Sequence, residues 1–269
     1  MELGIAGRRA LVIGSSSGMG AGIAIGLARE GVNVIVHGRS ADSAGRVAAQ
    51  IAKEGGSASV VLASLDDPAA VEGLARDALA LGPIDILVNC AGAAPTLYSW
   101  FDAPDDAWQK QFQLSLFYCV QLIRALVPAM RERGWGRVLN VSSGAAYKAM
   151  SFHPEYAAAK LSQHSLTATL SADLGDSGVT VNTLVSGAVV TPNTLQNIEH
   201  TAQAFGFTET GSALEKRVIR DGWKIDIPLG RLGRIDELAD AACFLVSERA
   251  SYITGAALRV DGGATGCIA

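Results

Sequence analysis

The sequence is poor in the residues that build metal centres and disulfide frameworks. Its 269 residues include only four cysteines and four histidines. The cysteines form no CxxC pair and the histidines form no HExxH motif. We therefore expect no metal site, and a reducing, cytoplasmic setting in which the cysteines are free thiols. These are Cys90, Cys119, Cys243 and Cys267.

Charge of one sign and long apolar runs are also scarce. The chain has 22 Lys and Arg against 26 Asp and Glu, a formal net charge of −4, so it lacks the basic excess that binds nucleic acid. We expect no apolar run of the roughly 18 residues that cross a membrane. The early Glu2 does not fit a secretory signal. The sequence thus predicts neither a nucleic-acid partner nor a membrane partner.

What the sequence does have is an alternation of β-branched runs with Ala- and Leu-rich segments. Hydrophobic residues make up 49% of it, enough for a substantial core. Strands are predicted around Leu11, Val34, Val60, Leu87, Leu139 and Leu184 and over residues 253–263. A long helix is predicted from about Glu155 to Asp173. The alternation predicts one α/β domain over residues 1–269, doubly wound, with about seven parallel strands and helices on both faces.

One stretch, at about residues 192–229, interrupts this alternation. It mixes Asn, Gln, Thr and Gly with Phe205, Phe207 and Trp223. A long insertion of this kind is often a lid over a binding site. We expect a partly helical substrate lid here, with an ordinary pair of surface helices as the alternative.

The first predicted strand runs into a glycine-rich loop, IGSSSGMG at residues 13–20. Glycines allow a tight turn and a close approach to a pyrophosphate, whose charge is met by the free N–H groups at the start of the next helix. The loop therefore predicts a dinucleotide site. Its predicted cofactor-binding residues are Gly14, Ser16, Ser17, Gly18, Met19 and Gly20.

The same loop also fits a different enzyme class. Residues 14–18 spell G-x-S-x-G between a strand and a helix, the pattern of the nucleophile elbow of α/β-hydrolases. A serine hydrolase with Ser16 as nucleophile is therefore an alternative. It is weakened because the turn follows the first strand and because no downstream histidine has a supporting motif.

The end of the second predicted strand bears on the choice of cofactor. Sites for NAD carry an acidic residue there, which holds the ribose hydroxyls, but this chain has Gly38 followed by Arg39. Without the carboxylate a 2′-phosphate is not repelled, and a guanidinium can pair with it. This favours NADP(H). In the alternative, Asp42 binds the ribose and Arg39 is a solvated surface residue.

Tyr156 and Lys160 provide the candidate acid/base chemistry. They are four residues apart, on one face of the predicted long helix. A free phenol ionises near pH 10, and a neighbouring ammonium stabilises the phenolate and brings proton exchange toward neutral pH. Ser143, at the end of a predicted strand, can hydrogen-bond a substrate carbonyl.

With the glycine loop, LVNCAG, NVSS, YAAAK and VDGG in this order, the sequence resembles the short-chain dehydrogenase/reductase family over essentially its whole length. The resemblance implies a Rossmann-type domain that interconverts a ketone, or a 3-oxoacyl group, and a secondary alcohol with NADPH. It implies that Tyr156 gives the proton, Ser143 positions the carbonyl oxygen and Lys160 binds the nicotinamide ribose. It also implies a homotetramer or a dimer.

The resemblance extends the cofactor site beyond the glycine loop. Ser64 stands where the family often has an Asp beside the adenine, and Cys90 replaces the second Asn of an NNAG motif. The further cofactor-binding residues that it implies are Ser64, Leu65, Asn89, Ala91, Gly92, Val189 and Thr191.

Ser115 is the departure from the family pattern with the largest consequence. It stands where the family's catalytic Asn holds a water in a proton relay, and its hydroxyl is shorter than an amide. A non-catalytic NADP-binding sensor is therefore a further alternative, weakened by the retained Ser143, Tyr156 and Lys160.

The substrate pocket is expected to be apolar and roomy. Its expected lining comprises the lid aromatics with Ala93, Ala94, Pro95, Ala145, Met150, Phe152 and His153.

Overall fold

The computed structural model describes residues 2–92, 96, 98–148 and 152–266. Within them, seven strands form one parallel sheet in the order β3-β2-β1-β4-β5-β6-β7. The strands are β1 (Arg9–Ile13), β2 (Asn33–Gly38), β3 (Ser57–Leu62), β4 (Ile86–Asn89), β5 (Gly136–Ser143), β6 (Val179–Ser186) and β7 (Ala257–Val260). The predicted doubly wound domain with seven parallel strands is confirmed. The strand order reverses between β1 and β4, which is where such sheets bind ligands.

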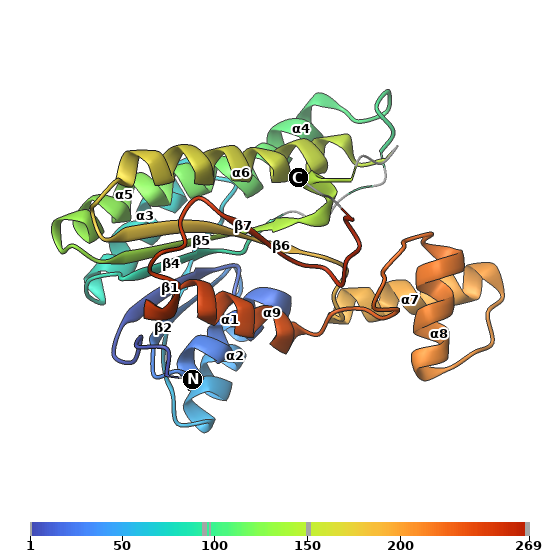
Figure 1. Ribbon diagram of the computed structural model, residues 1–269, viewed down its shortest axis with the longest axis horizontal. Helices are drawn as coiled ribbons and strands as arrows, with labels where there is room; N and C mark the ends of the chain where they lie inside the picture. Colours follow the sequence, from blue (N-terminus) through green and yellow to red (C-terminus); the bar gives the residue numbers. More distant parts are fainter. Residues whose placement is uncertain (1, 93–95, 97, 149–151, 267–269) are drawn as a thin grey trace.

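Helices cover both faces of the sheet (Figure 1). On one face α1, α2 and α9 enclose a core with Val12, Val36 and Leu184, and on the other α3, α5 and α6 enclose a core with Leu11, Leu87 and Val181. The helices are α1 (Gly18–Arg29), α2 (Ala41–Lys53), α3 (Pro68–Ala80), α4 (Asp105–Phe112), α5 (Tyr118–Glu132), α6 (Pro154–Leu174), α7 (Pro192–Phe205), α8 (Gly211–Arg217) and α9 (Ile235–Leu245). Shorter turns are the π-helical η1 (Gln113–Phe117) and η3 (Val218–Gly222) and the 3-10 turns η2 (Gly144–Ala146) and η4 (Glu248–Ala250).

One helical segment is long and apolar enough on average to cross a membrane, although it contains no unbroken apolar run of 18 residues. Residues 105–132, which form α4, η1 and α5 in succession, are long and apolar enough. The apolar face of α5 is nevertheless part of the protein core, because Tyr118, Leu122, Leu126 and Met130 are all buried there. A core helix of a globular domain passes the same test, so this segment is weak support for a membrane span.

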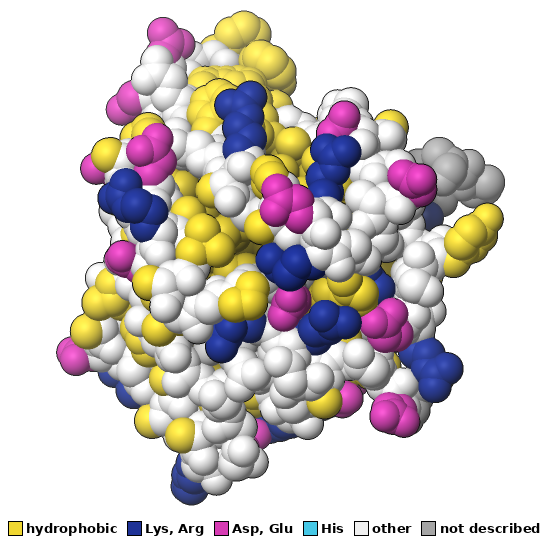
Figure 2. Space-filling view, turned by 90° about the vertical axis from the view of Figure 1, so that its left-hand side faces the viewer, with side chains coloured by type: hydrophobic (Ala, Val, Ile, Leu, Met, Phe, Trp, Pro, Cys, Tyr) yellow, Lys and Arg dark blue, Asp and Glu magenta, His cyan; other side chains and the backbone are white. Residues whose placement is uncertain are grey.

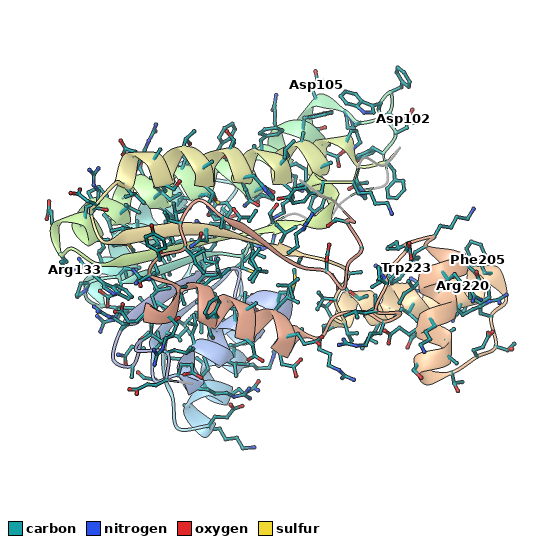
Figure 3. The ribbon with its side chains drawn as sticks, in the orientation of Figure 1. Asp102, Asp105, Arg133, Phe205, Arg220 and Trp223 are labelled. Atoms are coloured by element: carbon teal, nitrogen blue, oxygen red, sulfur yellow. The ribbon has the colours of Figure 1, made fainter. Side chains whose placement is uncertain are left out.

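Residues 192–229 form a largely helical lobe at the carboxyl end of the sheet. It contains α7, α8 and η3 and extends away from the body of the domain (Figure 1). Figure 3 places Phe205, Arg220 and Trp223 in this lobe, Asp102 and Asp105 beside α4, and Arg133 at the opposite end of the sheet. The lobe has its own small core around Ile198, Val218 and Ile219.

The surface has no large field of one charge on the face shown in Figure 2. Basic and acidic side chains alternate there, with hydrophobic patches between them. This distribution agrees with the small net charge of −4.

Candidate active site

The loop after β1 has a shape that only small residues permit. Gly14 has φ +75°, and a Cβ on it would lie 2.8 Å from the Cα of Ala91. A Cβ on Gly20 would meet the carbonyl oxygen of Gly14. The loop is therefore pressed against the end of β4 and against the start of α1, and its backbone lines an open cleft.

His37 fixes this loop, and the sequence analysis missed it. The backbone N–H of Gly14 donates to its Nδ1 at 3.1 Å, and the His37 N–H donates to Ser15 Oγ at 2.9 Å. Burial lowers the pKa of His37 to about 4, so the ring is neutral. Since Nδ1 accepts, the ring proton is on Nε2, and a backbone contact with Ala63 offsets part of the effect of burial on the pKa. A polar residue paired with a loop N–H leaves no signal in a sequence pattern.

The cleft holds about 660 Å³ and brings seven of the predicted cofactor-binding residues together. Those among its lining are Gly14, Ser16, Ser17, Arg39, Leu65, Ala91 and Gly92. Ser64 is not in that lining but hydrogen-bonds Asp66, which is. Gly18 and Met19 begin α1, and Met19 packs on the core.

The end of β2 cannot carry a side chain. A Cβ on Gly38 would lie 2.6 Å from the Cβ of Ser16, so the glycine-rich loop occupies the space that a carboxylate would need. Arg39 is exposed, lines the cleft with Ser16 and Ser17, and forms no ion pair within the described residues. Asp42 lies in the first turn of α2 and is not among the lining residues.

Val189 and Thr191 lie where β6 leads into the lobe. Val189 is buried and pairs with Gly233 in an isolated bridge. The Oγ1 of Thr191 accepts from the Thr194 N–H at 3.2 Å and so caps α7. The segment that contains these two predicted cofactor-binding residues is thus also the segment that joins the lobe to the sheet.

Ser143, Tyr156 and Lys160 come from β5 and α6, which pack together. Ser143 is the last residue of β5, and its Oγ accepts from the Ala145 N–H at 3.2 Å. Tyr156 is partly exposed, and the Nζ of Lys160 lies 5.9 Å from its ring centroid. A Cβ on Gly92 would be 3.3 Å from that Nζ. The ammonium therefore lies between the phenol and the wall of the cleft.

Asn89, which was predicted to bind the cofactor, has a structural role in the fold. It is fully buried, and its Nδ2 donates to Asn140 Oδ1 at 2.9 Å. Asn140 in turn donates to Thr167 Oγ1 at 2.9 Å, and Thr167 shares a 2.7 Å bond with Thr183. This chain of hydrogen bonds links β4, β5, α6 and β6 under the site.

Ser115 lies in the π turn η1, and its side-chain hydroxyl and its backbone carbonyl have different surroundings. Its hydroxyl is fully buried and has no hydrogen-bond partner within the described residues. Its carbonyl oxygen accepts from Gln163 Nε2 at 2.7 Å and from Cys119 Sγ at 3.2 Å. Lys160 Nζ donates to Val141 O at 3.0 Å and to Gln163 Oε1 at 3.5 Å. Gln163 was not among the site residues predicted from the sequence.

The wall beside Tyr156 is more polar than expected. His153, with φ +46°, lies ring to ring with Tyr156 at 5.7 Å, is 6% exposed, and has no hydrogen-bond partner for either ring nitrogen within the described residues. Burial lowers its pKa. Glu155 lines the cleft with a buried carboxyl group. An apolar residue, Phe152, also lies here, with its ring centroid 4.5 Å from that of His153.

Several predicted residues lie elsewhere or outside the described part of the chain. Phe207 and Trp223 pack in the core of the lobe, where Trp223 Nε1 donates to Thr201 Oγ1 at 2.9 Å. Ala93, Ala94, Pro95, Met150 and Cys267 lie outside the described residues. Cys90, Cys119 and Cys243 are free thiols, and residues 2–92, 96, 98–148 and 152–266 contain no cluster of three potential metal ligands.

Comparison with known proteins gives a consistent family. Residues 13–265 match the family model described as enoyl-(acyl carrier protein) reductase. A D-beta-hydroxybutyrate dehydrogenase of Rhizobium meliloti (strain 1021) is 32% identical over 263 residues, covering 96% of this chain and 98% of the relative.

Two solved structures extend the comparison. A 3-oxoacyl (acyl-carrier-protein) reductase of Agrobacterium tumefaciens C58 with NADP bound has a TM-score of 0.86 and 32% identity, covering 97% of this chain and 95% of that one. A 7 alpha-hydroxysteroid dehydrogenase complexed with NADH and 7-oxo glycochenodeoxycholic acid has a TM-score of 0.84 and 30% identity, covering 98% and 96%.

These relatives act on different substrates and are seen with different nicotinamide cofactors, but they share the sheet and nearly the whole length of the chain. The similarity supports NAD(P)-dependent oxidoreduction between a hydroxyl group and a ketone, and it does not favour a hydrolase. From the family model, the relatives and the seven-stranded parallel sheet together, the chain belongs to the short-chain dehydrogenase/reductase family.

Proposed function

We propose that this protein is an NADPH-dependent reductase that interconverts a ketone, or a 3-oxoacyl group, and a secondary alcohol, with Tyr156 as the acid and base. The observation that supports it most is the arrangement of Lys160, whose Nζ lies 5.9 Å from the Tyr156 ring and beside Gly92 at the cofactor cleft. One ammonium can then serve both the phenol and a bound nucleotide.

The cleft fits a dinucleotide. Gly14 and Gly20 leave a backbone cradle that a Cβ would fill, and N–H groups at the start of α1 can meet a pyrophosphate. Arg39 supports NADP(H), because it lines the cleft together with Ser16 and Ser17, forms no ion pair within the described residues, and has no carboxylate competing with it at Gly38. When bound, the nicotinamide supplies the hydride.

In the proposed reaction this chain's residues position the substrate and move a proton. Ser143 Oγ donates a hydrogen bond to the carbonyl oxygen, Tyr156 Oη gives that oxygen its proton, and Lys160 stabilises the phenolate that remains. In the oxidative direction the phenolate takes the proton from the alcohol. The lobe at residues 192–229 is proposed as the lid over the substrate, and a homotetramer or dimer as the assembly.

Initial rates with NADPH and with NADH over a panel of ketones and 3-oxoacyl thioesters test this proposal. We expect turnover, with NADPH preferred. Tight NADPH binding without turnover of any of these compounds would favour a sensor instead. Labelling of Ser16 by a fluorophosphonate would favour the hydrolase.

A further inference from the structure

Helix α6 carries a buried polar stripe that continues past the catalytic pair. Tyr156, Lys160, Gln163 and Thr167 follow one another at intervals of four, three and four residues, so they share one face of the helix. Gln163 is fully buried. A buried carboxamide destabilises the fold unless its hydrogen bonds are made, so its partners define what it does.

The two ends of the Gln163 amide face groups of opposite hydrogen-bonding type, one a donor and the other an acceptor. Its Oε1 lies 3.5 Å from Lys160 Nζ, and its Nε2 donates to Ser115 O at 2.7 Å. An ammonium can only donate and a carbonyl oxygen can only accept, so the amide fits in one orientation alone. Ser115 lies in the π turn η1, a type of irregularity that is frequent at functional sites, and its carbonyl oxygen accepts from two side chains.

We propose that Gln163 is a positioning residue for the acid/base pair, and that its amide links the ammonium of Lys160 to the backbone of the π turn at Ser115. With Val141 O at 3.0 Å, Gln163 Oε1 gives the ammonium two fixed acceptors, which leaves its remaining N–H for the cleft. The inference rests on the proposed function of Tyr156 and Lys160.

This link also bears on the role of Ser115. The carbonyl that could order a water already accepts from Gln163 and from Cys119. A carboxamide passes a proton poorly, because it must first adopt an imidic-acid form, so the contact holds Lys160 in place and does not relay protons. Proton supply to Tyr156 then comes from the cleft side.

Three titratable groups that interact with Lys160 stay neutral near pH 7. Burial raises the pKa of both Cys90 and Cys119 to about 11. Burial, followed by the charge of Lys160, lowers the pKa of His164 on the same helix. None of the three therefore supplies a charge that competes with the ammonium at the phenol.

The test is the ionisation of one tyrosine in variants at position 163. Gln163→Met keeps the length of the side chain and removes both polar ends, whereas Gln163→Glu adds a negative charge beside Lys160. Thr167→Val is the control, because it removes buried hydrogen bonds on the same helix face without touching Lys160. Phenolate absorbance is titrated with pH for each protein, with and without NADP, and the titration of its Tyr156→Phe counterpart is subtracted.

If Gln163 positions Lys160, Gln163→Met should raise the midpoint of the phenolate titration by about half a unit or more, and Gln163→Glu by about one unit. Thr167→Val should lower Tm and leave the midpoint in place. Overlapping midpoints for the wild type and both Gln163 variants would overturn the inference and leave Gln163 as a packing residue.

The titration needs no substrate, so the inference and the proposed function can fail separately. If the wild type turns over no ketone, the proposed function fails, and the midpoints still decide whether Gln163 acts on the pair. If turnover is present, kcat for ketone reduction should fall about tenfold or less in Gln163→Met while KM for NADPH changes little.

Discussion

The glycine-rich loop at residues 13–20 and the region around Lys160 belong to the same candidate site, but different forces shape them. Sterics shape the loop, because a Cβ on Gly14 would meet the backbone of Ala91 and a Cβ on Gly38, at the end of β2, would meet Ser16 of the loop. Buried side-chain hydrogen bonds shape the other region, where Lys160, Gln163 and the Ser115 carbonyl hold one another. Substitutions in the first region should therefore act on cofactor binding, and substitutions in the second should act on turnover.

The largest effect is expected at Tyr156. Tyr156→Phe removes the proton donor and keeps the ring, so kcat for ketone reduction should fall by a factor on the order of 10²–10⁴. Fluorescence titration with NADPH should show unchanged cofactor binding, since the hydroxyl is not part of the loop. Retention of half the wild-type kcat would mean that another group is the acid.

Arg39 tests the loop side of the comparison. Arg39→Ala should weaken NADPH binding by at least about tenfold, or ~1.4 kcal/mol, and should leave NADH binding nearly unchanged. The kcat at saturating NADPH should stay close to that of the wild type. Arg46→Ala on the adjacent helix α2 is a matched control, because Arg46 is not among the residues that line the cleft. Tighter binding of NADH than of NADPH by the wild type would refute the assignment.

His37 makes the loop sensitive to acid. Its pKa is lowered to about 4 by burial, so the unfolded chain binds a proton first as the pH falls below 6.5. The free energy of unfolding should thus decrease between pH 6.5 and 4, by about 3 kcal/mol from this residue when the titration is complete. Protonation also removes the acceptor of the Gly14 N–H.

The measurement is Tm and the Kd for NADPH from pH 7 to 4.5 in wild type and His37→Asn. The Asn Oδ1 can accept from Gly14 and does not titrate. We expect a smaller loss of stability and of NADPH affinity on acidification in the variant. Parallel pH profiles for the two proteins would show that His37 is not the group responsible.

The same contrast explains how far the sequence alone could lead. Glycine spacing and β-branched runs report local backbone requirements, so the seven strands and the loop were predicted correctly. Gly14, which donates to His37, lies 23 residues from it, and Ser115, which accepts from Gln163, lies 48 residues from it. Such contacts appear only once β1 and β2, or η1 and α6, are packed together, and a single sequence does not report them.

The wall of the predicted substrate pocket shows a second property that a single sequence does not report, namely which buried polar groups find partners. His153 was predicted as part of an apolar lining, but both of its ring nitrogens are buried beside Tyr156 and have no hydrogen-bond partner among the residues that the structure describes. Whether a buried polar residue is satisfied depends on what packs around it, which residue type does not specify.

The smallest effect is expected at Ser115, the residue that departs most from the family pattern. Its hydroxyl has no partner within the described residues, whereas its backbone carbonyl already binds Gln163 and Cys119. Ser115→Ala removes only the hydroxyl and leaves the carbonyl, so kcat should change by less than about twofold and its pH profile should keep its shape. Ser115→Asn should be neutral or harmful, because a Cβ on Gly92 would already lie 4.0 Å from Ser115 Oγ and a longer side chain must find space beside Lys160. The measurement is kcat against pH for both variants at saturating NADPH and ketone. A large loss in Ser115→Ala with a shifted profile would restore Ser115 to the proton path and reverse the contrast with Gln163, since the hydroxyl would then contribute more than the carbonyl beside it.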